Sequence, residues 1–325
     1  MTGGRHGNRP QRTPRAPRTW IVPVVLTVGL ALLAGCAGSS SSGPPTATPG
    51  GPGRFQGQVD IGDGRKIYLS CSGRGTPTVI LESGYHDSSG LWSVDEPVPP
   101  AVGPSVQDRL AEHVRVCSYD RPGTLVYGTP LALTTRSTPV PQPRTAGAAV
   151  RDLHALVGAA KLTTPVVIVA HSFGGLLTQL YAQTYPKEVA GVVFVDAFPA
   201  TLPRAMGDQW PAYQQLLASP GTALDADPAF ERFDVDASVA EIKAAPAFPP
   251  IPIAVLSKTE PFPVPPTNPI APVLLTAWPA RQQDLVDLRP GTPHLLATGS
   301  DHYVQVSNPD LVADTALLVI GRIAP

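Results

Sequence analysis

The chain has 325 residues, a hydrophobic content of 42% and a net charge of −1 at pH 7. This length accommodates one large domain with its own core, with or without an inserted subdomain. The near-zero charge argues against a nucleic-acid-binding protein and against attachment to an anionic surface through a basic patch. We therefore expect no nucleic-acid partner, and no feature of the sequence implies a protein partner.

The N-terminal region has the composition of an export signal. Five arginines lie between Arg5 and Arg18, no acidic residue precedes Asp60, and an apolar stretch runs from Trp20 to Ala34. A basic leader, an apolar stretch and a small-residue cleavage site are typical of a secretory signal peptide. The apolar stretch is short and contains a proline, which argues against a membrane-spanning helix.

The signal ends in Leu33-Ala34-Gly35-Cys36, which resembles the bacterial lipobox. The resemblance implies a lipoprotein signal peptide over residues 1–36, with lipidated Cys36 holding the protein on the outer face of the bacterial cell membrane. The protein is secreted if the anchor is not made, and an ordinary signal peptide or an uncleaved anchor are the alternatives. Residues 37–54 are rich in Ser, Gly, Pro and Thr and predict a disordered tether to a domain over residues 55–325.

In that domain, short apolar strands alternate with amphipathic helices. Two strands over residues 56–61 and 66–71, joined by Gly62-Asp63-Gly64, predict an antiparallel hairpin. Further strands are predicted at 78–81, 114–117, 165–170, 192–195, 251–256 and near 294–297, and helices at 105–113, 145–162, 176–185 and 308–323. This order predicts an α/β domain whose mainly parallel sheet is covered by helices on both faces.

Residues 197–250 interrupt this alternation with helical and irregular sequence. We interpret them as a small helical lid inserted over the site. The large apolar side chains in this range are candidate pocket walls or else the lid's own small core. They are Trp210, Tyr213, Leu216, Leu217, Phe230 and Phe233.

A serine follows the strand over residues 165–170 in the segment Ala170-His171-Ser172-Phe173-Gly174. A serine on a sharp strand-to-helix turn has a strained backbone and an exposed hydroxyl, and its neighbours two residues away must be small. Ala170 and Gly174 meet this condition, although glycine is more usual at the first position. We expect Ser172 to be a nucleophile; an incidental serine in an ordinary turn is the alternative.

A serine hydroxyl becomes a strong nucleophile only when a base takes its proton. His302 lies between the last predicted strand and the last predicted helix, in Gly299-Ser300-Asp301-His302. We predict that it is this base, the alternative being an ordinary surface or core histidine. His171 is expected to shape the turn or the pocket, because it points away from the serine on such a turn.

The order of these motifs resembles the α/β-hydrolase superfamily, from about Gln56 to the C-terminus. The segment 81–85 lies where the family has its oxyanion segment, and 119–123 resembles the turn after the fourth strand. The segment 300–302 resembles the one that delivers the catalytic histidine. The resemblance implies the α/β-hydrolase fold.

The resemblance also implies an oxyanion hole made of the backbone amides of Phe173 and Tyr85. Ser83 replaces the histidine that is common there, and Gly84 is either part of this hole or an ordinary turn glycine. Asp120-Arg121 has the form of a binding pair, but a turn brace or ion pair near the pocket rim is the preferred interpretation.

The superfamily places its triad acid after either of two strands, and both places hold an acid here. Asp196 follows the strand over residues 192–195, and Glu260 follows the strand over residues 251–256. Prolines crowd the loop of Glu260, whereas an acid at the place of Asp196 often only braces backbone. Both stay open, with a preference for Asp196.

In this fold the second and fourth strands are neighbours. Cys71 ends one of them and Cys117 ends the other, so the resemblance predicts a disulfide, which is consistent with export. Two unpaired buried thiols are the alternative.

These observations predict a serine hydrolase that cleaves small to medium carboxylic esters, or related acyl substrates, through an acyl-enzyme. The prediction includes no metal and no organic cofactor. A serine at the nucleophile position argues against a haloalkane dehalogenase or an epoxide hydrolase. The alternative is a non-catalytic surface lipoprotein that binds a ligand on a hydrolase scaffold.

Overall fold

The computed structural model describes residues 48–93, 103–128, 130–219 and 221–323. The predicted signal peptide, Cys36 and the tether up to residue 47 lie outside the described residues. Within the described part of the chain, no helix is both long and apolar enough to cross a bilayer.

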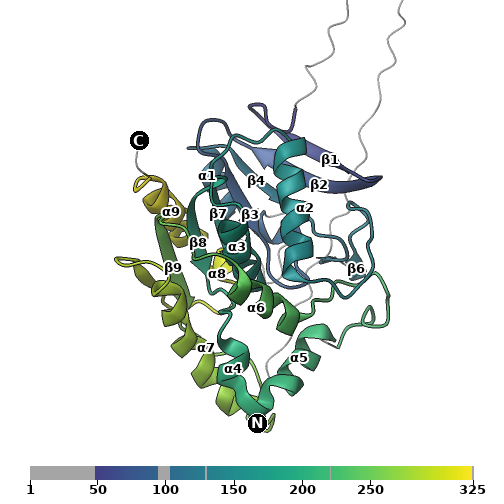
Figure 1. Ribbon diagram of the computed structural model, residues 1–325, viewed down its shortest axis with the longest axis vertical. Helices are drawn as coiled ribbons and strands as arrows, with labels where there is room; N and C mark the ends of the chain where they lie inside the picture. The colour runs from purple at the N-terminus through teal and green to yellow at the C-terminus, as the bar shows by residue number, and fades with distance from the viewer. Residues whose placement is uncertain (1–47, 94–102, 129, 220, 324–325) are drawn as a thin grey trace, which may run out of the picture. The chain divides into compact units, whose positions relative to one another are not determined.

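Eight strands form one sheet in the order β1-β2-β4-β3-β7-β8-β9-β10 (Figure 1). The strands are β1 (Phe55–Gly62), β2 (Arg65–Ser72), β3 (Val79–Glu82), β4 (Val116–Tyr119), β7 (Val166–His171), β8 (Val189–Val195), β9 (Ile253–Lys258) and β10 (His294–Ala297). The β1–β2 and β2–β4 pairs are antiparallel and the other pairs are parallel. The predicted mainly parallel sheet with an antiparallel edge is confirmed.

The composition of the strands matches their place in the sheet. The central strands β3, β7 and β8 consist almost wholly of apolar residues and are buried along their whole length. Strands covered on both faces require such runs, whereas the edge strand β1 alternates half-buried and exposed residues. A separate ladder joins β5 (Leu125–Val126) and β6 (Ala132–Leu133), two short strands that the sequence pattern did not reveal.

Two layers of helices cover the sheet, as predicted. On one face α2 (Ala146–Ala159), α3 (Phe173–Thr184) and α6 (Val235–Ala244) contact one another. On the other face α9 (Pro309–Ile320) contacts α1 (Val106–Ala111), β8 and the short α8 (Val304–Ser307). Each layer has its own apolar core, so the carboxyl ends of the parallel strands are held rigidly between them.

The remaining helices lie beyond the carboxyl ends of the strands. The chain forms α4 (Leu202–Met206) and α5 (Trp210–Ala218) after β8, and α7 (Ala271–Val286) after β9. They gather at one end of the molecule in Figure 1, where α4 packs against both α5 and α7. The sequence pattern did not predict α7, because Pro272 at its start and Pro279 inside it obscure the helical periodicity. Single 3-10 turns complete the structure at η1 (Ser89–Trp92) and η2 (Gly207–Gln209).

The predicted disulfide is present. Cys71 of β2 lies opposite Cys117 of β4 in the antiparallel register, and their sulfur atoms are bonded. The two-thiol alternative is therefore excluded.

Candidate active site

The segment around Ser172 forms the sharp corner that the sequence predicted. Ser172 joins β7 to α3 with φ 50° and ψ −125°, in a positive-φ region that residues other than glycine rarely adopt. Its N–H donates to the carbonyl of Val195 (3.1 Å), and its carbonyl accepts from the N–H of Phe198 (2.8 Å). The neighbouring strand and the segment after it therefore hold the strained corner in place.

Two glycines let α3 pack against this corner. A Cβ atom on Gly174 would lie 2.5 Å from the carbonyl oxygen of Ser83, and one on Gly175 would lie 2.4 Å from the Cβ of Ala197. Real side chains do not approach so closely, so both positions require glycine. The motif requires a small residue two positions after the serine. At Gly174 the missing side chain leaves room for the backbone at the end of β3.

Ser172, His302 and Asp196 form one chain of hydrogen bonds. The distance from Ser172 Oγ to His302 Nε2 is 2.9 Å, and from His302 Nδ1 to Asp196 Oδ2 it is 2.6 Å. Because a carboxylate accepts, Nδ1 carries the ring proton and Nε2 is left to accept from the serine hydroxyl. The structure therefore brings together the predicted nucleophile, the predicted base and the preferred acid.

Asp196 is fully buried at the end of β8. Its second oxygen, Oδ1, accepts from the indole N–H of Trp278 (3.1 Å) and lies 3.4 Å from the backbone N of Lys258. Glu260 is exposed, and its carboxylate is approached by the hydroxyl of Thr259. Of the two candidate acids, only Asp196 contacts His302; Asp301 accepts from the backbone N–H of Tyr303, so it points elsewhere, as expected.

The surroundings of His302 favour its neutral form. Burial lowers the pKa of His302 below its ordinary value, and this outweighs the hydrogen bond to Asp196, which acts to raise it. A neutral imidazole is the form that can take a proton from a hydroxyl at neutral pH.

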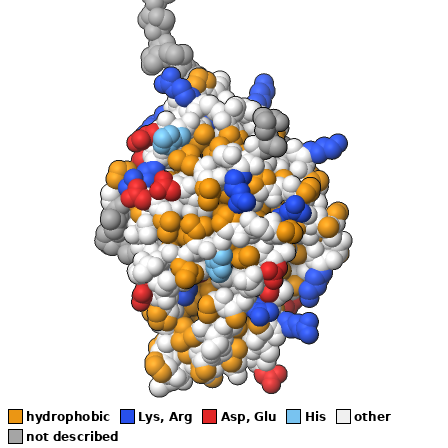
Figure 2. All heavy atoms as spheres, turned by 90° about the vertical axis from the view of Figure 1, so that its left-hand side faces the viewer, with side chains coloured by type: hydrophobic (Ala, Val, Ile, Leu, Met, Phe, Trp, Pro, Cys, Tyr) orange, Lys and Arg blue, Asp and Glu red, His pale blue; other side chains and the backbone are white. Residues whose placement is uncertain are grey.

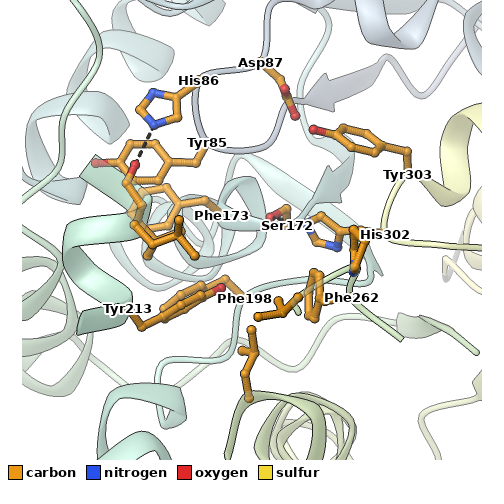
Figure 3. A pocket seen from close by; sticks show the side chains of 15 residues that line it. Tyr85, His86, Asp87, Ser172, Phe173, Phe198, Tyr213, Phe262, His302 and Tyr303 are labelled. Atoms are coloured by element: carbon orange, nitrogen blue, oxygen red, sulfur yellow. Dashed lines mark hydrogen bonds between the residues drawn. The ribbon is translucent and has the colours of Figure 1, made fainter. Parts of the chain in front are cut away.

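The residues that carry the predicted oxyanion donors, Phe173 and Tyr85, lie next to each other near Ser172 (Figure 3). Phe173 is the first residue of α3, so its N–H has no acceptor within the helix. Tyr85 lies in the turn after β3, and its ring stacks on that of Phe173 with centroids 4.8 Å apart. A Cβ atom on Gly84 would lie 2.7 Å from Asp87 Oδ2 and 2.8 Å from His171 Nδ1, so glycine is needed there for space.

His171 braces the loop that carries His302. Its Nε2 donates to the backbone carbonyl of His302 (2.8 Å), and its Nδ1 lies 3.7 Å from Asp87 Oδ2. The ring is buried, and its one hydrogen bond goes to the loop and not to the serine hydroxyl. This arrangement agrees with the shaping role expected for His171.

A cavity of about 230 Å³ opens beside Ser172 and His302 (Figure 3). Phe198, Tyr213 and Phe262 form an aromatic wall on one side, whereas Asp87 and Tyr303 face each other on the opposite side. Asp87, Phe262 and Tyr303 were not singled out from the sequence. Of these three residues, only Tyr303 has a feature in the sequence that points to the site, because it directly follows His302.

The six candidate wall residues divide into two groups. Three line the cavity, namely Tyr213, Leu216 and Leu217. The other three pack nearby instead: Phe230 stacks on His86, Phe233 contacts the ring of Phe173, and Trp210 donates to Asp236. Trp210 thus packs within the predicted lid, as the alternative stated, whereas Phe230 and Phe233 pack against residues outside it and fit neither prediction.

The part of the chain that the structure describes holds no candidate metal site, and the face in Figure 2 has no patch of charge of one sign. Among the described residues, no group of three or more His, Cys, Asp or Glu side chains is placed to hold a metal ion. Figure 2 shows basic and acidic side chains scattered together over one face of the molecule.

A model of the alpha/beta hydrolase family matches residues 79–315, which include the corner at Ser172, the turn after β3 that carries Tyr85 (the oxyanion turn) and the loop that carries His302. The chain belongs to the alpha/beta hydrolase family. This family membership agrees with the observed strand order and with the position of Ser172 between β7 and α3.

Several curated proteins are similar to part of this alpha/beta hydrolase. An AB hydrolase superfamily protein of Gibberella zeae is 26% identical over 147 residues, which are 43% of this chain and 39% of that protein. The uncharacterized protein YqjL of Bacillus subtilis is 29% identical over 119 residues, 37% of this chain and 39% of YqjL. The chain spans between about a quarter and two fifths of the length of the curated relatives it matches.

Solved structures share the fold. An esterase from Thermogutta terrifontis superposes with a TM-score of 0.53 at 15% identity, covering 84% of this chain and 99% of the esterase. The haloalkane dehalogenase DatA from Agrobacterium tumefaciens gives 0.54 at 20% identity, covering 85% and 99%. At these identities the likeness concerns the fold and not the reaction.

Proposed function

We propose that this alpha/beta hydrolase is a serine hydrolase that cleaves small to medium carboxylic esters through an acyl-enzyme. The single observation that carries the proposal is the chain of hydrogen bonds from Ser172 through His302 to Asp196, beside a cavity. A nucleophile, a base and a buried acid that orients the base are the parts that acyl transfer requires.

In the first half-reaction, Ser172 Oγ attacks the ester carbonyl carbon while its proton passes to His302 Nε2. The carbonyl oxygen becomes an oxyanion, which the amides of Phe173 and Tyr85 stabilise by hydrogen bonds. Asp196 stabilises the imidazolium that has formed. When the tetrahedral intermediate collapses, the bond to the leaving oxygen breaks and His302 gives its proton to that oxygen, so an alcohol leaves.

The second half-reaction repeats these roles with water. His302 takes a proton from a water molecule as this attacks the acyl carbon, and the same amides hold the new oxyanion. Collapse breaks the bond to Ser172 Oγ, which regains its proton from His302, and the carboxylic acid is released.

The size and lining of the cavity support the choice of substrate. A volume of about 230 Å³ lies below the range of about 300–1,000 Å³ that is usual for sites of drug-sized ligands. The aromatic and aliphatic lining favours an apolar acyl group. The nucleophile position holds a serine and not a carboxylate, which argues against dehalogenase chemistry despite the similarity to DatA.

The test is a panel of short- and medium-chain esters, run with the purified domain and with Ser172→Ala. We expect Ser172→Ala to lower kcat/KM by a factor of about 10⁴ or more, because no other group replaces the nucleophile. A fluorophosphonate probe, which reacts with activated serines, should label the unchanged protein and not the variant. Absence of labelling and of ester turnover in the unchanged protein would instead favour the non-catalytic ligand-binding lipoprotein.

Export and anchoring are a separate part of the proposal. The lipobox-like sequence before Cys36 supports a lipid anchor on the outer face of the cell membrane, and the tether would then separate the domain from the lipid surface. Cys36→Ala should move the protein from the membrane fraction to the soluble fraction. Unchanged fractionation of this variant would refute the anchor and leave the hydrolase proposal unaffected.

A further inference from the structure

A buried cluster of charged side chains lies behind the oxyanion turn. Arg121, which follows β4, donates to Glu82 Oε1 (2.7 Å) and to Glu231 Oε1 (2.7 Å) and Oε2 (3.0 Å). None of these three side chains is more than 3% exposed. Buried charges are tolerated only when they are paired and hydrogen-bonded, so the cluster constrains every element that contributes to it.

The same guanidinium holds the backbone of the oxyanion turn. Arg121 donates to the carbonyls of Ser83 (2.8 Å) and Gly84 (2.5 Å), so that all five of its N–H groups are used. The peptide between Gly84 and Tyr85 is planar and trans, so its N–H points opposite to its carbonyl. By holding the Gly84 carbonyl, Arg121 directs the Tyr85 N–H to the other side of this peptide, away from the buried cluster.

Glu231 ties this arrangement to the segment that follows α5. Its Oε2 also accepts from the backbone N–H of His86 (2.8 Å), one residue beyond Tyr85. The His86 ring donates to the carbonyl of Leu217 (2.7 Å; Figure 3), and the Tyr85 hydroxyl accepts from the N–H of Phe233 (2.6 Å). Residues of the predicted lid (197–250) thus hold the oxyanion turn at one backbone N–H, that of His86, and at the side chains of His86 and Tyr85.

We propose that Glu231 is a positioning residue for the oxyanion hole, acting through Arg121 and the His86 amide to aim the Tyr85 N–H. This inference rests on the proposed function, because it concerns the donor to the oxyanion of the acyl-transfer reaction. A donor that is displaced from the developing charge loses most of its effect on the transition state while substrate binding changes little.

The experiment compares Glu231→Gln with the matched control Glu241→Gln. Glu241 also accepts two hydrogen bonds, from the hydroxyl of Thr145 (2.8 Å) and the N–H of Gly147 (2.7 Å), but it lies on α6, outside the site. Glu231→Gln removes the negative charge and replaces one carboxylate oxygen with an NH₂ group. This donor then faces either Arg121 Nε, which donates to Oε1, or Arg121 Nη2 and the His86 N–H, which share Oε2, so one side of the arrangement loses its acceptor. The quantities to measure are kcat, KM, Tm and inhibition by an alkyl boronic acid, whose adduct with Ser172 resembles the tetrahedral intermediate.

We expect Glu231→Gln to lower kcat by about 10- to 100-fold and to weaken boronate inhibition in parallel, with KM within about two-fold. The control should lower Tm without these kinetic changes. If Glu231→Gln does not fold, Glu231→Asp serves the same comparison, because it keeps the charge near Arg121 and withdraws the carboxylate from the His86 amide.

The inference would be overturned if folded Glu231→Gln or Glu231→Asp kept the kcat and the boronate affinity of the unchanged protein. It would also be overturned if the control Glu241→Gln lowered kcat and boronate affinity as much as the Glu231 variants do. These outcomes leave the proposed function intact. An unchanged protein that turns over no ester and is not labelled would instead overturn the proposed function itself.

Discussion

Asp196 and Glu260 follow neighbouring parallel strands, β8 and β9, and therefore begin from the same edge of the sheet. Asp196 is fully buried, and both of its carboxylate oxygens have hydrogen-bond donors. Glu260 lies on an exposed loop, directly before a proline, and its carboxylate faces Thr259. Two acids that look equivalent in the sequence thus have entirely different surroundings.

The difference shows what makes a carboxylate able to orient a base. Asp196 has a positive φ of 38°, and its N–H donates to the carbonyl of Leu256 on β9 (2.6 Å). This backbone bond directs the short side chain across the strand ends towards His302. An exposed acid on a loop has no such constraint, and water screens its charge. Position in the sheet and burial, more than order in the chain, select the acid.

Among the substitutions that test this comparison of the two acids, Asp196→Asn has the largest expected effect. An amide cannot stabilise the imidazolium, and its N–H₂ favours the wrong ring tautomer of His302, so kcat/KM should fall by about 10³- to 10⁴-fold. Steady-state kinetics on a reactive ester measure this, with circular dichroism as the control for folding. Near-full activity of a folded Asp196→Asn would show that burial alone does not identify the acid.

A smaller effect is expected from Trp278→Phe, which keeps an aromatic ring and removes the N–H that donates to Asp196. Without this donor the carboxylate interacts more strongly with the imidazolium, so the pKa of His302 should rise. Since the reaction needs neutral His302, the acid limb of kcat/KM should move to higher pH, and activity near pH 6 should fall by about 3- to 10-fold.

The pH profile also gives a reference point in the unchanged protein. Because burial lowers the pKa of His302, its acid limb should lie below the ordinary histidine value of about 6.5. A uniform loss of activity in Trp278→Phe with an unmoved acid limb would mean that Trp278 only packs against the site.

The smallest effect belongs to Glu260→Gln. This substitution changes an exposed side chain whose carboxylate accepts from Thr259 and not from His302, so Tm should stay close to its original value and kcat/KM should change by about two-fold at most. Thermal unfolding and steady-state kinetics measure the two quantities. A severe loss of kcat/KM in folded Glu260→Gln would identify Glu260, and not Asp196, as the triad acid.

Local patterns in the sequence were sufficient to predict the fold and the two site residues Ser172 and His302. The apolar runs of β3, β7 and β8 predict buried parallel strands because almost no other residue types occur there. Ser172 and His302 were identifiable because each lies between a predicted strand and a predicted helix, where geometry restricts what the side chain can do.

The rest depends on contacts between distant segments. The choice between Asp196 and Glu260 was open because it depends on which carboxylate is buried beside His302. Part of the surroundings of Asp196 comes from Trp278, which lies on a helix that its prolines made hard to predict. Nothing in the sequence indicated a role for Glu231, because this residue lies in irregular sequence, 110 residues from its partner Arg121. The preferred interpretation of Arg121 as a brace proved correct, but its dependence on the insertion could not be read from a one-dimensional pattern.

Placing the acid after β8 has a consequence for how the protein can diversify. In the proposed triad the loop after β9 carries no catalytic acid, and its residues Phe262, Pro263 and Val264 form part of the cavity wall. Substitutions at Pro263 and Val264 can reshape the proposed acyl pocket, whereas Phe262 also packs against His302 and Trp278 and so supports the proton-transfer groups. For laboratory evolution, randomising Pro263 and Val264 while keeping Phe262 offers a route to new ester preferences.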